Sequence, residues 1–210
     1  MAGSGRTGVP SGTPVKGAGA SSAIIGAMET HIAQLNPLAQ DVQRLVAAHL
    51  RFTGAASPAE FAFALDHNAL DDRQVTLFGL RRSGELLAIG ALKHLDAGHA
   101  ELKSMHTAER ARGQGLGRQM LQHLLEAARA AGYRRVSLET GTTVEFSAAR
   151  SLYARAGFVA CAPFADYRAS EWNTFMTLEL GAAGAVDGLT PSPPTGAGAQ
   201  PLRSADGAAR

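Results

Sequence analysis

The feature that most constrains the fold is a strand, a glycine-rich turn and a helix in immediate succession. Residues 100–107 (AELKSMHT) have the composition of a β-strand, and residues 116–131 repeat apolar side chains at helical spacing. Between them, residues 112–118 (RGQGLGR) place three glycines at alternate positions between two arginines. A strand that leads through a short turn into an amphipathic helix is typical of an α/β protein with helices packed on a sheet.

The glycine-rich turn by itself is compatible with two functions, phosphate binding or a flexible basic loop. The start of a helix presents backbone N–H groups and a positive dipole end to an anion, and glycine lets the backbone approach closely. Arg112 and Arg118 add positive charge that suits phosphate. However, the turn lacks the Gly-Lys-Ser/Thr ending of a nucleoside-triphosphate loop and the glycine spacing of a dinucleotide-binding turn. The turn alone therefore leaves both functions open.

Strand and helix patterns alternate along the rest of the chain. The strand-forming segments are residues 29–35, 74–82, 85–95, 100–107, 133–140, 158–164 and 174–180. The helix-forming segments are residues 37–50, 57–69, 116–131 and 147–157. The order of these elements predicts one mixed sheet covered by helices.

Short local motifs indicate where individual elements begin and end. Asn36 is expected to cap the first helix, with Pro37 at its first position and Gly54 beyond its end. Residues 57–60 (SPAE) form a capping box that would open the second helix. Residues 83–84 (SG) predict a tight hairpin turn between two strands.

The two ends of the chain differ in composition from the middle. Residues 1–23 and 181–210 are rich in Gly, Ala, Ser, Thr and Pro and poor in large apolar side chains. Such segments bury too little apolar surface to offset the entropy of ordering. We therefore expect disordered tails around a single domain at residues 24–180, an ordinary length for one domain.

Composition also narrows the expected partners and compartment. The net charge is +2 with scattered Lys and Arg residues, which argues against nucleic acid as a partner. No apolar run approaches the roughly 20 residues of a membrane helix and no secretion signal is evident, so we expect a cytoplasmic protein without a membrane partner. The single cysteine, Cys161, fits this reducing compartment. The seven histidines have no metal-ligand spacing with Cys or Asp, so no metal site is expected.

Two motifs about 40 residues apart suggest a family. The first is residues 112–117 (RGQGLG), which follow the pattern Arg/Gln-x-x-Gly-x-Gly/Ala, and the second is residues 149–158 (ARSLYARAGF). Together they resemble the acetyl-CoA-binding signature and the A..LY...GF helix of the GNAT superfamily of N-acetyltransferases. The phrases GALK, ELKSM, SLETG, PFADY and FMTLEL resemble the YsnE-like bacterial group of that superfamily, and the resemblance covers about residues 29–180.

The resemblance implies an α+β fold of the GNAT type, with a mixed, mostly antiparallel sheet. Its fourth and fifth strands, residues 100–107 and 133–140, would splay apart and admit the pantetheine arm of acetyl-CoA, the implied co-substrate. The chain departs from the family at Phe146, where many members have an asparagine that contacts this arm. The residues implied in co-substrate binding are Met105, His106, Thr107, Arg112, Gly113, Gln114, Gly115, Leu116, Gly117, Arg118 and Phe146.

The resemblance implies two residues in catalysis, Glu101 and Tyr153. An acceptor amine with a pKa of about 10.4 is almost fully protonated at pH 7, so a proton acceptor is useful. Glu101 lies where some family members have a catalytic glutamate; alternatively it is a surface charge paired with Lys103. Glu139 on the fifth strand is the alternative candidate for this proton acceptor. Tyr153 lies at the family position that protonates or stabilises the departing thiolate; alternatively it is a core tyrosine.

Three residues are candidates for the acceptor site: Glu139, Asp166 and Tyr167. The last two lie in the loop between the final strands, which often walls the acceptor pocket in this fold; a solvated loop is the alternative. The expected function is acetylation of a small-molecule or amino-acid-like amine by direct attack in a ternary complex. A non-catalytic acyl-CoA-binding regulatory protein is the alternative, and the sequence leaves open whether the chain is a monomer or a homodimer.

Overall fold

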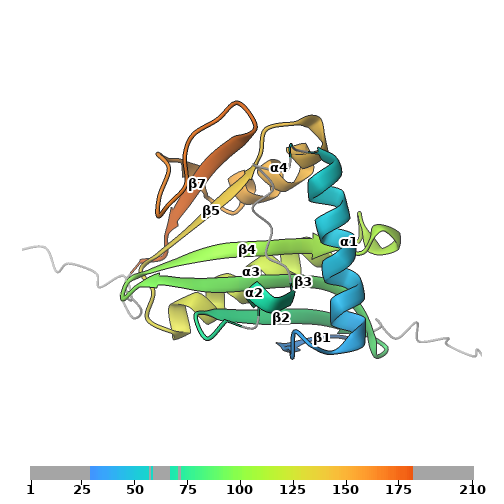
Figure 1. Cartoon of the computed structure of the whole chain (residues 1–210). Coiled ribbons are helices and arrows are strands. Elements are labelled where there is room, and N and C mark those ends of the chain that lie inside the picture. Colours follow the sequence, from blue (N-terminus) through green and yellow to red (C-terminus); the bar gives the residue numbers. More distant parts are fainter. Residues whose placement is uncertain (1–28, 57, 59–66, 71, 182–210) are drawn as a thin grey trace, which may run out of the picture.

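Seven strands of the described residues form one sheet in the order β1-β2-β3-β4-β5-β7-β6 (Figure 1). The computed structural model describes residues 29–56, 58, 67–70 and 72–181. The strands are β1 (Thr30–Gln34), β2 (Val75–Arg82), β3 (Glu85–Asp96), β4 (His99–Thr107), β5 (Arg135–Gly141), β6 (Val159–Ala160) and β7 (Asn173–Glu179). The helices are α1 (Gln40–Ala56), α2 (His67–Leu70), α3 (Leu116–Ala130) and α4 (Ser147–Arg155), with short 3-10 turns η2 (Glu109–Ala111) and η3 (Val144–Phe146). The predicted order of strands and helices is confirmed.

The sheet is antiparallel except at its centre, where β4 and β5 run parallel. These two strands pair only from His99 opposite Arg135 to Glu101 opposite Ser137. Farther along, β5 continues to pair with β7 as far as Gly141, while β4 stays with β3 (Figure 1). The predicted mixed sheet with two splayed central strands is therefore confirmed. The facing backbone groups of the diverging strands lose their ladder partners and need others.

Helices cover both faces of this sheet. In Figure 1, α1 and α2 lie in front of the strands, and α3 and α4 lie behind them. Helix α3 lies directly on β3, since a Cβ added at Gly90 would come within 2.7 Å of Leu124 Cδ1. The buried face of α3 consists of Leu116, Met120, Leu121, Leu124, Leu125 and Ala128. The hydrophobic core therefore sits between the sheet and its helices, as the amphipathic patterns predict.

Two predicted features of the first helix are wrong. Helix α1 begins at Gln40, because the Asn36 Oδ1 accepts a hydrogen bond from the Leu38 N–H at 2.8 Å and forms a turn before the helix. Gly54 lies inside α1 instead of beyond its end. The neighbouring Thr53 is buried, and tertiary packing of this kind outweighs the low helix propensity of one glycine.

Two other predicted elements differ in extent from the structure. The expected second helix falls mostly on residues outside the described part of the chain, and its described end, residues 67–70, is helical. The expected strand at residues 158–164 is shorter, because only Val159 and Ala160 form β6. After Cys161 donates its N–H to Phe175 O at 3.0 Å, Pro163 has no N–H with which to continue the pairing. The hairpin turn at residues 83–84 is confirmed, with φ of 50° at Ser83 and 81° at Gly84.

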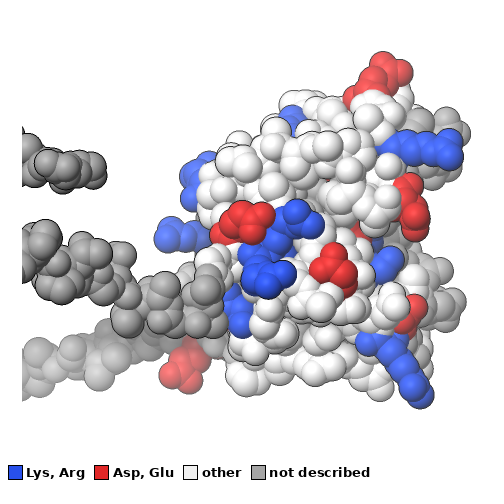
Figure 2. All heavy atoms as spheres, turned by 90° about the vertical axis from the view of Figure 1, so that its left-hand side faces the viewer, with Lys and Arg blue, Asp and Glu red and all other residues white. Residues whose placement is uncertain are grey.

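The surface shown in Figure 2 has mixed charge. Acidic and basic side chains are interspersed on this face, which lies on the left-hand side of Figure 1. This face therefore offers no continuous basic surface of the kind that binds nucleic acid. Within the described ranges, no helix combines the length and the apolar character needed to cross a membrane.

Candidate active site

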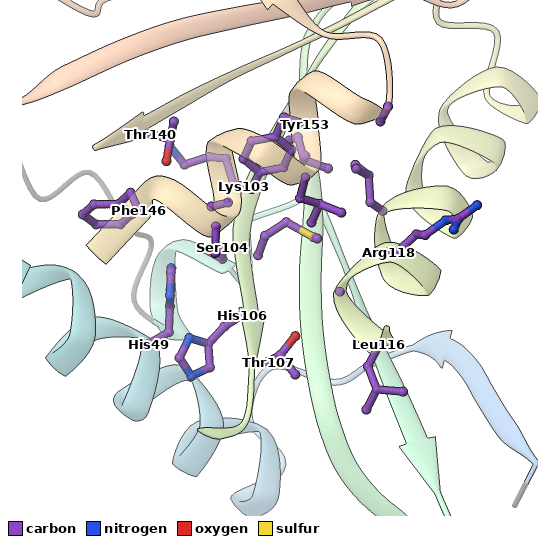
Figure 3. A pocket seen from close by; sticks show the side chains of 18 of the residues that line it. His49, Lys103, Ser104, His106, Thr107, Leu116, Arg118, Thr140, Phe146 and Tyr153 are labelled. Carbon is purple, nitrogen blue, oxygen red and sulfur yellow. The ribbon is translucent and has the colours of Figure 1, made fainter. Parts of the chain in front are cut away.

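A cavity of about 1180 Å³ opens where β4 and β5 diverge. Its walls come from α1, β4, the glycine-rich turn, α3, β5 and α4 (Figure 3). The residues singled out in the sequence that line it are Glu101, Met105, His106, Thr107, Arg112, Gly113, Gly115, Leu116, Gly117, Arg118, Glu139, Phe146 and Tyr153. Gln114, Asp166 and Tyr167 are not among its lining residues. The fold thus brings together residues from segments far apart in the sequence.

Strand β4 is irregular in the middle of the cavity wall. Its register with β3 shifts between Ile89 and Ala91, so that Ser104 and Met105 oppose the single residue Gly90. Ser104 has a φ of 53°, in the left-handed region that residues other than glycine rarely adopt. Its buried hydroxyl has no hydrogen-bond partner among the described residues. This bulge interrupts the regular ladder of β4 beside the cavity, and backbone strain of this kind clusters at functional sites.

The turn before α3 presents backbone N–H groups to the cavity. Gly113 and Gly115 have φ of 75° and 78°, while a Cβ at either would meet no atom within 4 Å, so glycine is needed for conformation rather than for space. No side chain of the described residues caps the start of α3. Because the first N–H groups of a helix have no acceptor within it, those at residues 116–118 are available to an anion. This geometry would suit an oxyanion such as a phosphate.

The two polar side chains of this turn point in different directions. The Arg112 Nε donates to Thr107 O at 3.3 Å, and its guanidinium lies 5.4 Å from the centroid of the Phe52 ring. Gln114 turns away from the cavity, since its Oε1 accepts a hydrogen bond from Arg82 Nη1 at 2.7 Å. Arg112 thus holds its charge at the cavity wall, whereas Gln114 offers at most its backbone N–H.

Glu101 is paired with Lys103, but it is not a surface charge. Its side chain is 2% exposed, and its Oε1 accepts hydrogen bonds from Lys103 Nζ at 3.1 Å and from the Tyr167 hydroxyl at 2.5 Å. Lys103 Nζ also donates to the Tyr167 hydroxyl oxygen at 2.5 Å. Two donors of the protein therefore already occupy one oxygen of this carboxylate. Tyr167, outside the cavity lining, contacts the site through this network.

Glu139 on β5 lines the same cavity and is half-buried. Burial raises the pKa of Glu139 to about 7; the charge of Lys103 opposes this shift and that of Glu101 adds to it. A carboxyl group that titrates near neutrality is a better proton acceptor at pH 7 than an ordinary glutamate. The pKa of Glu139 differs from that of an ordinary glutamate because the side chain is partly buried on β5, and the sequence does not reveal this burial.

Tyr153 lies on α4 and is 6% exposed. Its ring packs against Phe158 at a centroid distance of 5.8 Å. Burial raises the pKa of Tyr153 above its ordinary value, and the charge of Glu139 raises it further. The phenol is therefore neutral at pH 7 and is able to donate a hydrogen bond. In Figure 3 it lies at the same end of the pocket as Lys103, opposite Leu116 and Arg118.

A wall of aromatic rings from α1 also belongs to the site, and the sequence did not predict it. His49 approaches His106 at a ring-centroid distance of 5.2 Å (Figure 3). Phe52 approaches His106 at 6.2 Å and meets Phe146 edge-to-face at 5.4 Å. Burial lowers the pKa of His49 to about 3 and that of His106 to about 4, so both imidazoles are neutral at pH 7. The amphipathic pattern of α1 identifies a buried face but not the element that covers it.

The remaining candidates lie away from the cavity. Asp166 is exposed in the loop between β6 and β7. Cys161 is half-buried after β6, and burial raises the pKa of its thiol. Across the described ranges, no group of three His, Cys, Asp or Glu side chains is arranged to hold a metal ion.

The chain is similar to known proteins over most of its described length. The family model described as Acetyltransferase (GNAT) family matches residues 42–158. A Bacillus subtilis relative, named uncharacterized N-acetyltransferase YsnE, is 41% identical over 141 residues, which are 67% of this chain and 93% of that protein. An Azospirillum brasilense relative, named IAA acetyltransferase, is 34% identical over 151 residues, 71% of this chain and 97% of that protein.

A solved structure shows the same fold. It is a Klebsiella pneumoniae protein described as an acyl-CoA N-acyltransferase, with a TM-score of 0.60 and 26% identity, and it matches over 72% of this chain and 97% of its own. The matched family segment runs from α1 to the end of α4 and includes the glycine-rich turn, β4, β5 and Tyr153. The chain therefore belongs to the GNAT family of acetyltransferases and is an acyltransferase.

Proposed function

We propose that this protein transfers the acetyl group of acetyl-CoA to the amine of a small-molecule or amino-acid-like acceptor. The observation that carries the proposal is the shape of the cavity between β4 and β5. The start of α3 lies at one end, and Tyr153 lies at the other (Figure 3). This layout suits an extended thioester whose diphosphate lies far from its reacting carbonyl.

The co-substrate would be held chiefly by backbone groups. The N–H groups at residues 113–118 would bind the diphosphate, because the left-handed glycines and the uncapped helix start leave them free to point at an anion. The β4 backbone at residues 105–107 would pair with the amides of the pantetheine arm. Phe146 would offer this arm an apolar contact in place of the family's asparagine, since its ring lines the cavity beside Gly141.

Glu139, rather than Glu101, would accept the proton of the acceptor amine. Moving a proton from an ammonium of pKa about 10.4 to an ordinary glutamate is uphill by about 8 kcal/mol, at about 1.4 kcal/mol per pKa unit. A carboxyl group with a pKa of about 7 reduces this cost to about 5 kcal/mol. A bridging water lets the proton pass in smaller steps. Glu101 is occupied by Lys103 and Tyr167, and this favours a structural role for it.

Tyr153 would stabilise the thiolate that leaves. The amine nitrogen forms a bond to the thioester carbonyl carbon, the carbon–sulfur bond breaks, and the sulfur departs with the bonding electron pair. A thiol has a pKa of about 8.5, well below that of a buried tyrosine, so complete proton transfer from Tyr153 to the sulfur is uphill. The phenol therefore contributes as a hydrogen-bond donor to the developing thiolate.

Direct attack in a ternary complex needs no covalent enzyme intermediate. Cys161 lies outside the cavity lining, and burial raises the pKa of its thiol, which lowers its reactivity. The name of the Azospirillum brasilense relative specifies IAA, which supports a small molecule rather than a protein as the acceptor.

A thiol-release assay over a panel of amines tests the proposal. Wild-type protein is mixed with acetyl-CoA and each amine, free CoA is detected with a thiol reagent, and the acetylated product is identified by mass spectrometry. We expect acetyl-CoA binding by calorimetry and turnover with at least one amine. Binding of acetyl-CoA without turnover of any amine would instead support a regulatory acyl-CoA-binding protein.

A further inference from the structure

We propose that a second cavity, lined by arginines of α1 and of the segment after β4, binds an anionic group carried by the acceptor. The ligand class is an amine whose far end is an oxyanion, either a carboxylate or a phosphate. This inference rests on the proposed function, because it assigns the class of molecule that the acetyl group reaches.

The second cavity has a volume of about 890 Å³ and adjoins the first. Its walls are α1, the turn between β2 and β3, and residues 108–112. Phe52, His106 and Arg112 line both cavities and form their shared wall. The two cavities therefore meet at these three side chains.

The charges of the second cavity are unbalanced in favour of positive groups. Arg81 pairs with Asp41 at 2.5 Å, and Arg110 pairs with Glu85. The remaining carboxylate of the wall belongs to Glu109, which is exposed. Three further arginines of this wall have no carboxylate partner within the described part of the chain; they are Arg44, Arg51 and Arg112.

These three arginines line the cavity from two elements. Arg44 and Arg51 are two helical turns apart on α1 and share a face, with the small Ala48 between them. Arg112 lines the cavity from the turn after β4, where Thr107 O and the Phe52 ring contact its guanidinium. Planar guanidinium groups bind carboxylates and phosphates through pairs of hydrogen bonds, and this suits a terminal oxyanion.

The wall between the cavities defines the rest of the ligand. Phe52 and His106 contribute uncharged rings to this wall beside the charged Arg112, since burial holds His106 neutral at pH 7. His49 packs against His106 from the side of the first cavity and is neutral for the same reason. An amine near Glu139 and an oxyanion near Arg51 would thus be joined by an apolar middle segment. The structure therefore assigns a ligand with separated charges rather than a simple alkylamine.

Matched acceptors and matched variants test this assignment. The acceptors are linear amines of increasing chain length that end in a carboxylate, a phosphate or a methyl group. The variants are Arg44→Gln, Arg51→Gln and the double variant, with Arg73→Gln as a control of equal charge change at an exposed residue outside both cavities. For each combination of protein variant and acceptor, steady-state kinetics give kcat/KM for the acceptor and KM for acetyl-CoA. Calorimetry in the presence of CoA measures binding of the acceptor.

We expect wild-type protein to prefer an anionic over a methyl-ended amine of the same length. Each single variant should reduce this preference about threefold and the double variant about tenfold, because exposed charges interact only modestly. These reductions should be smaller at high salt, which screens exposed charges. Arg73→Gln should leave the preference unchanged. Comparison of the amines that end in a phosphate with those that end in a carboxylate then shows which oxyanion the cavity prefers.

Two results would overturn the assignment. The first is wild-type turnover or binding of methyl-ended amines as strong as that of anionic ones, which leaves the proposed acetyl transfer intact. The second is a rise in KM for acetyl-CoA in the arginine variants with no change in acceptor preference. That result would indicate that the second cavity binds a phosphate of the co-substrate instead of the acceptor. Absence of turnover with every amine contradicts the proposed function, while loss of anion binding in the double variant would still support the cavity.

Discussion

Glu101 and Glu139 lie on neighbouring strands, yet their surroundings give them different capabilities. Glu101 is buried and accepts hydrogen bonds from Lys103 and Tyr167. Glu139 is half-buried at the cavity, where desolvation raises its pKa to about 7. Removing Lys103 would leave a buried carboxylate without its cation, which is among the more destabilising changes in proteins. At the residue scale, these contacts favour a structural role for Glu101, and Glu139 is the proposed proton acceptor.

Glu139→Gln tests the proton acceptor. We expect wild-type kcat to rise as the pH increases through about 7, because Glu139 must lose its proton before it accepts another. The variant should lose this rise and about 100-fold in kcat at pH 7.5, with little change in acetyl-CoA binding. Steady-state rates between pH 5.5 and 9 provide the measurement. Glu101→Gln serves as the comparison, and a loss of the pH-dependent rise in that variant alone would assign the base to Glu101.

The same carboxyl group predicts a pH-dependent difference in stability. Its pKa is raised in the folded state, so the folded state favours the protonated form; this contribution is complete below the unfolded pKa of about 4.5 and is lost as the pH rises through about 7. Glu139→Gln should therefore match wild type at pH 4 and exceed its free energy of unfolding by about 1–2 kcal/mol at pH 8. Urea unfolding at both pH values measures this. Equal stability at pH 8 would contradict the raised pKa.

Tyr153→Phe tests the hydrogen bond to the departing thiolate. Because the ring is buried and packs against Phe158, phenylalanine preserves the packing and removes only the hydroxyl. We expect kcat to fall by about 10- to 100-fold while the dissociation constant of CoA stays unchanged. Turnover and calorimetry on the same samples separate the two effects. An unchanged kcat would show that Tyr153 is a core residue only.

At the scale of elements, two left-handed glycines at the two ends of α3 differ in surroundings. Gly115 has a φ of 78° at the start of the helix and lines the cavity, whereas Gly132 has a φ of 84° after its end and lies outside the lining. A Cβ at either meets no atom within 4 Å. Substitution of either glycine therefore introduces the same backbone strain, but only Gly115 belongs to the turn that we propose binds the diphosphate.

Gly115→Ala and Gly132→Ala form a matched test of this turn. Each should lower the free energy of unfolding by about 1 kcal/mol, the cost of a left-handed conformation for a residue with a Cβ. Only Gly115→Ala should weaken CoA binding, by about tenfold or more, because relief of the strain redirects the N–H groups at the start of α3. Thermal unfolding and calorimetry give both quantities. Equal losses of CoA affinity in the two variants would rule out a specific role for the turn.

At the scale of the whole molecule, the site depends on elements between β1 and β7. The strands and helices that form both cavities lie between residues 30 and 179. The composition of residues 1–23 and 181–210 predicts tails that add little to the core.

A chain trimmed to residues 24–180 tests the predicted domain boundaries. We expect its melting temperature to stay within about 2 °C of that of the full chain. A loss of about 1 kcal/mol in the free energy of unfolding would lower the melting temperature of a domain of this size by about that much or more. Its affinity for acetyl-CoA should be unchanged as well. Scanning calorimetry and binding calorimetry on both chains make the comparison. A clear loss of stability would place one of the tails in the fold.

The sequence by itself determined the features that depend on near neighbours in the chain. The left-handed glycines at residues 113–115, the helix from Leu116 and the tight turn at residues 83–84 follow from local backbone preferences. The alternation of strand and helix patterns predicted the mixed sheet, and the motifs at residues 112–117 and 149–158 predicted the family. Local signals failed at Gly54, because packing of α1 on the sheet outweighs the preference of one residue.

The tertiary structure alone decided which polar groups are buried and which of them meet. The ion pair of Glu101, the raised pKa of Glu139, the aromatic wall from α1 and the second cavity each join segments that are far apart in the sequence. Desolvation and charge interactions depend on distances between such segments, and no local pattern encodes these distances. For this reason the sequence could place a glutamate on each of two strands, but only the folded chain shows that Glu101 is paired with Lys103 and that the pKa of Glu139 is raised.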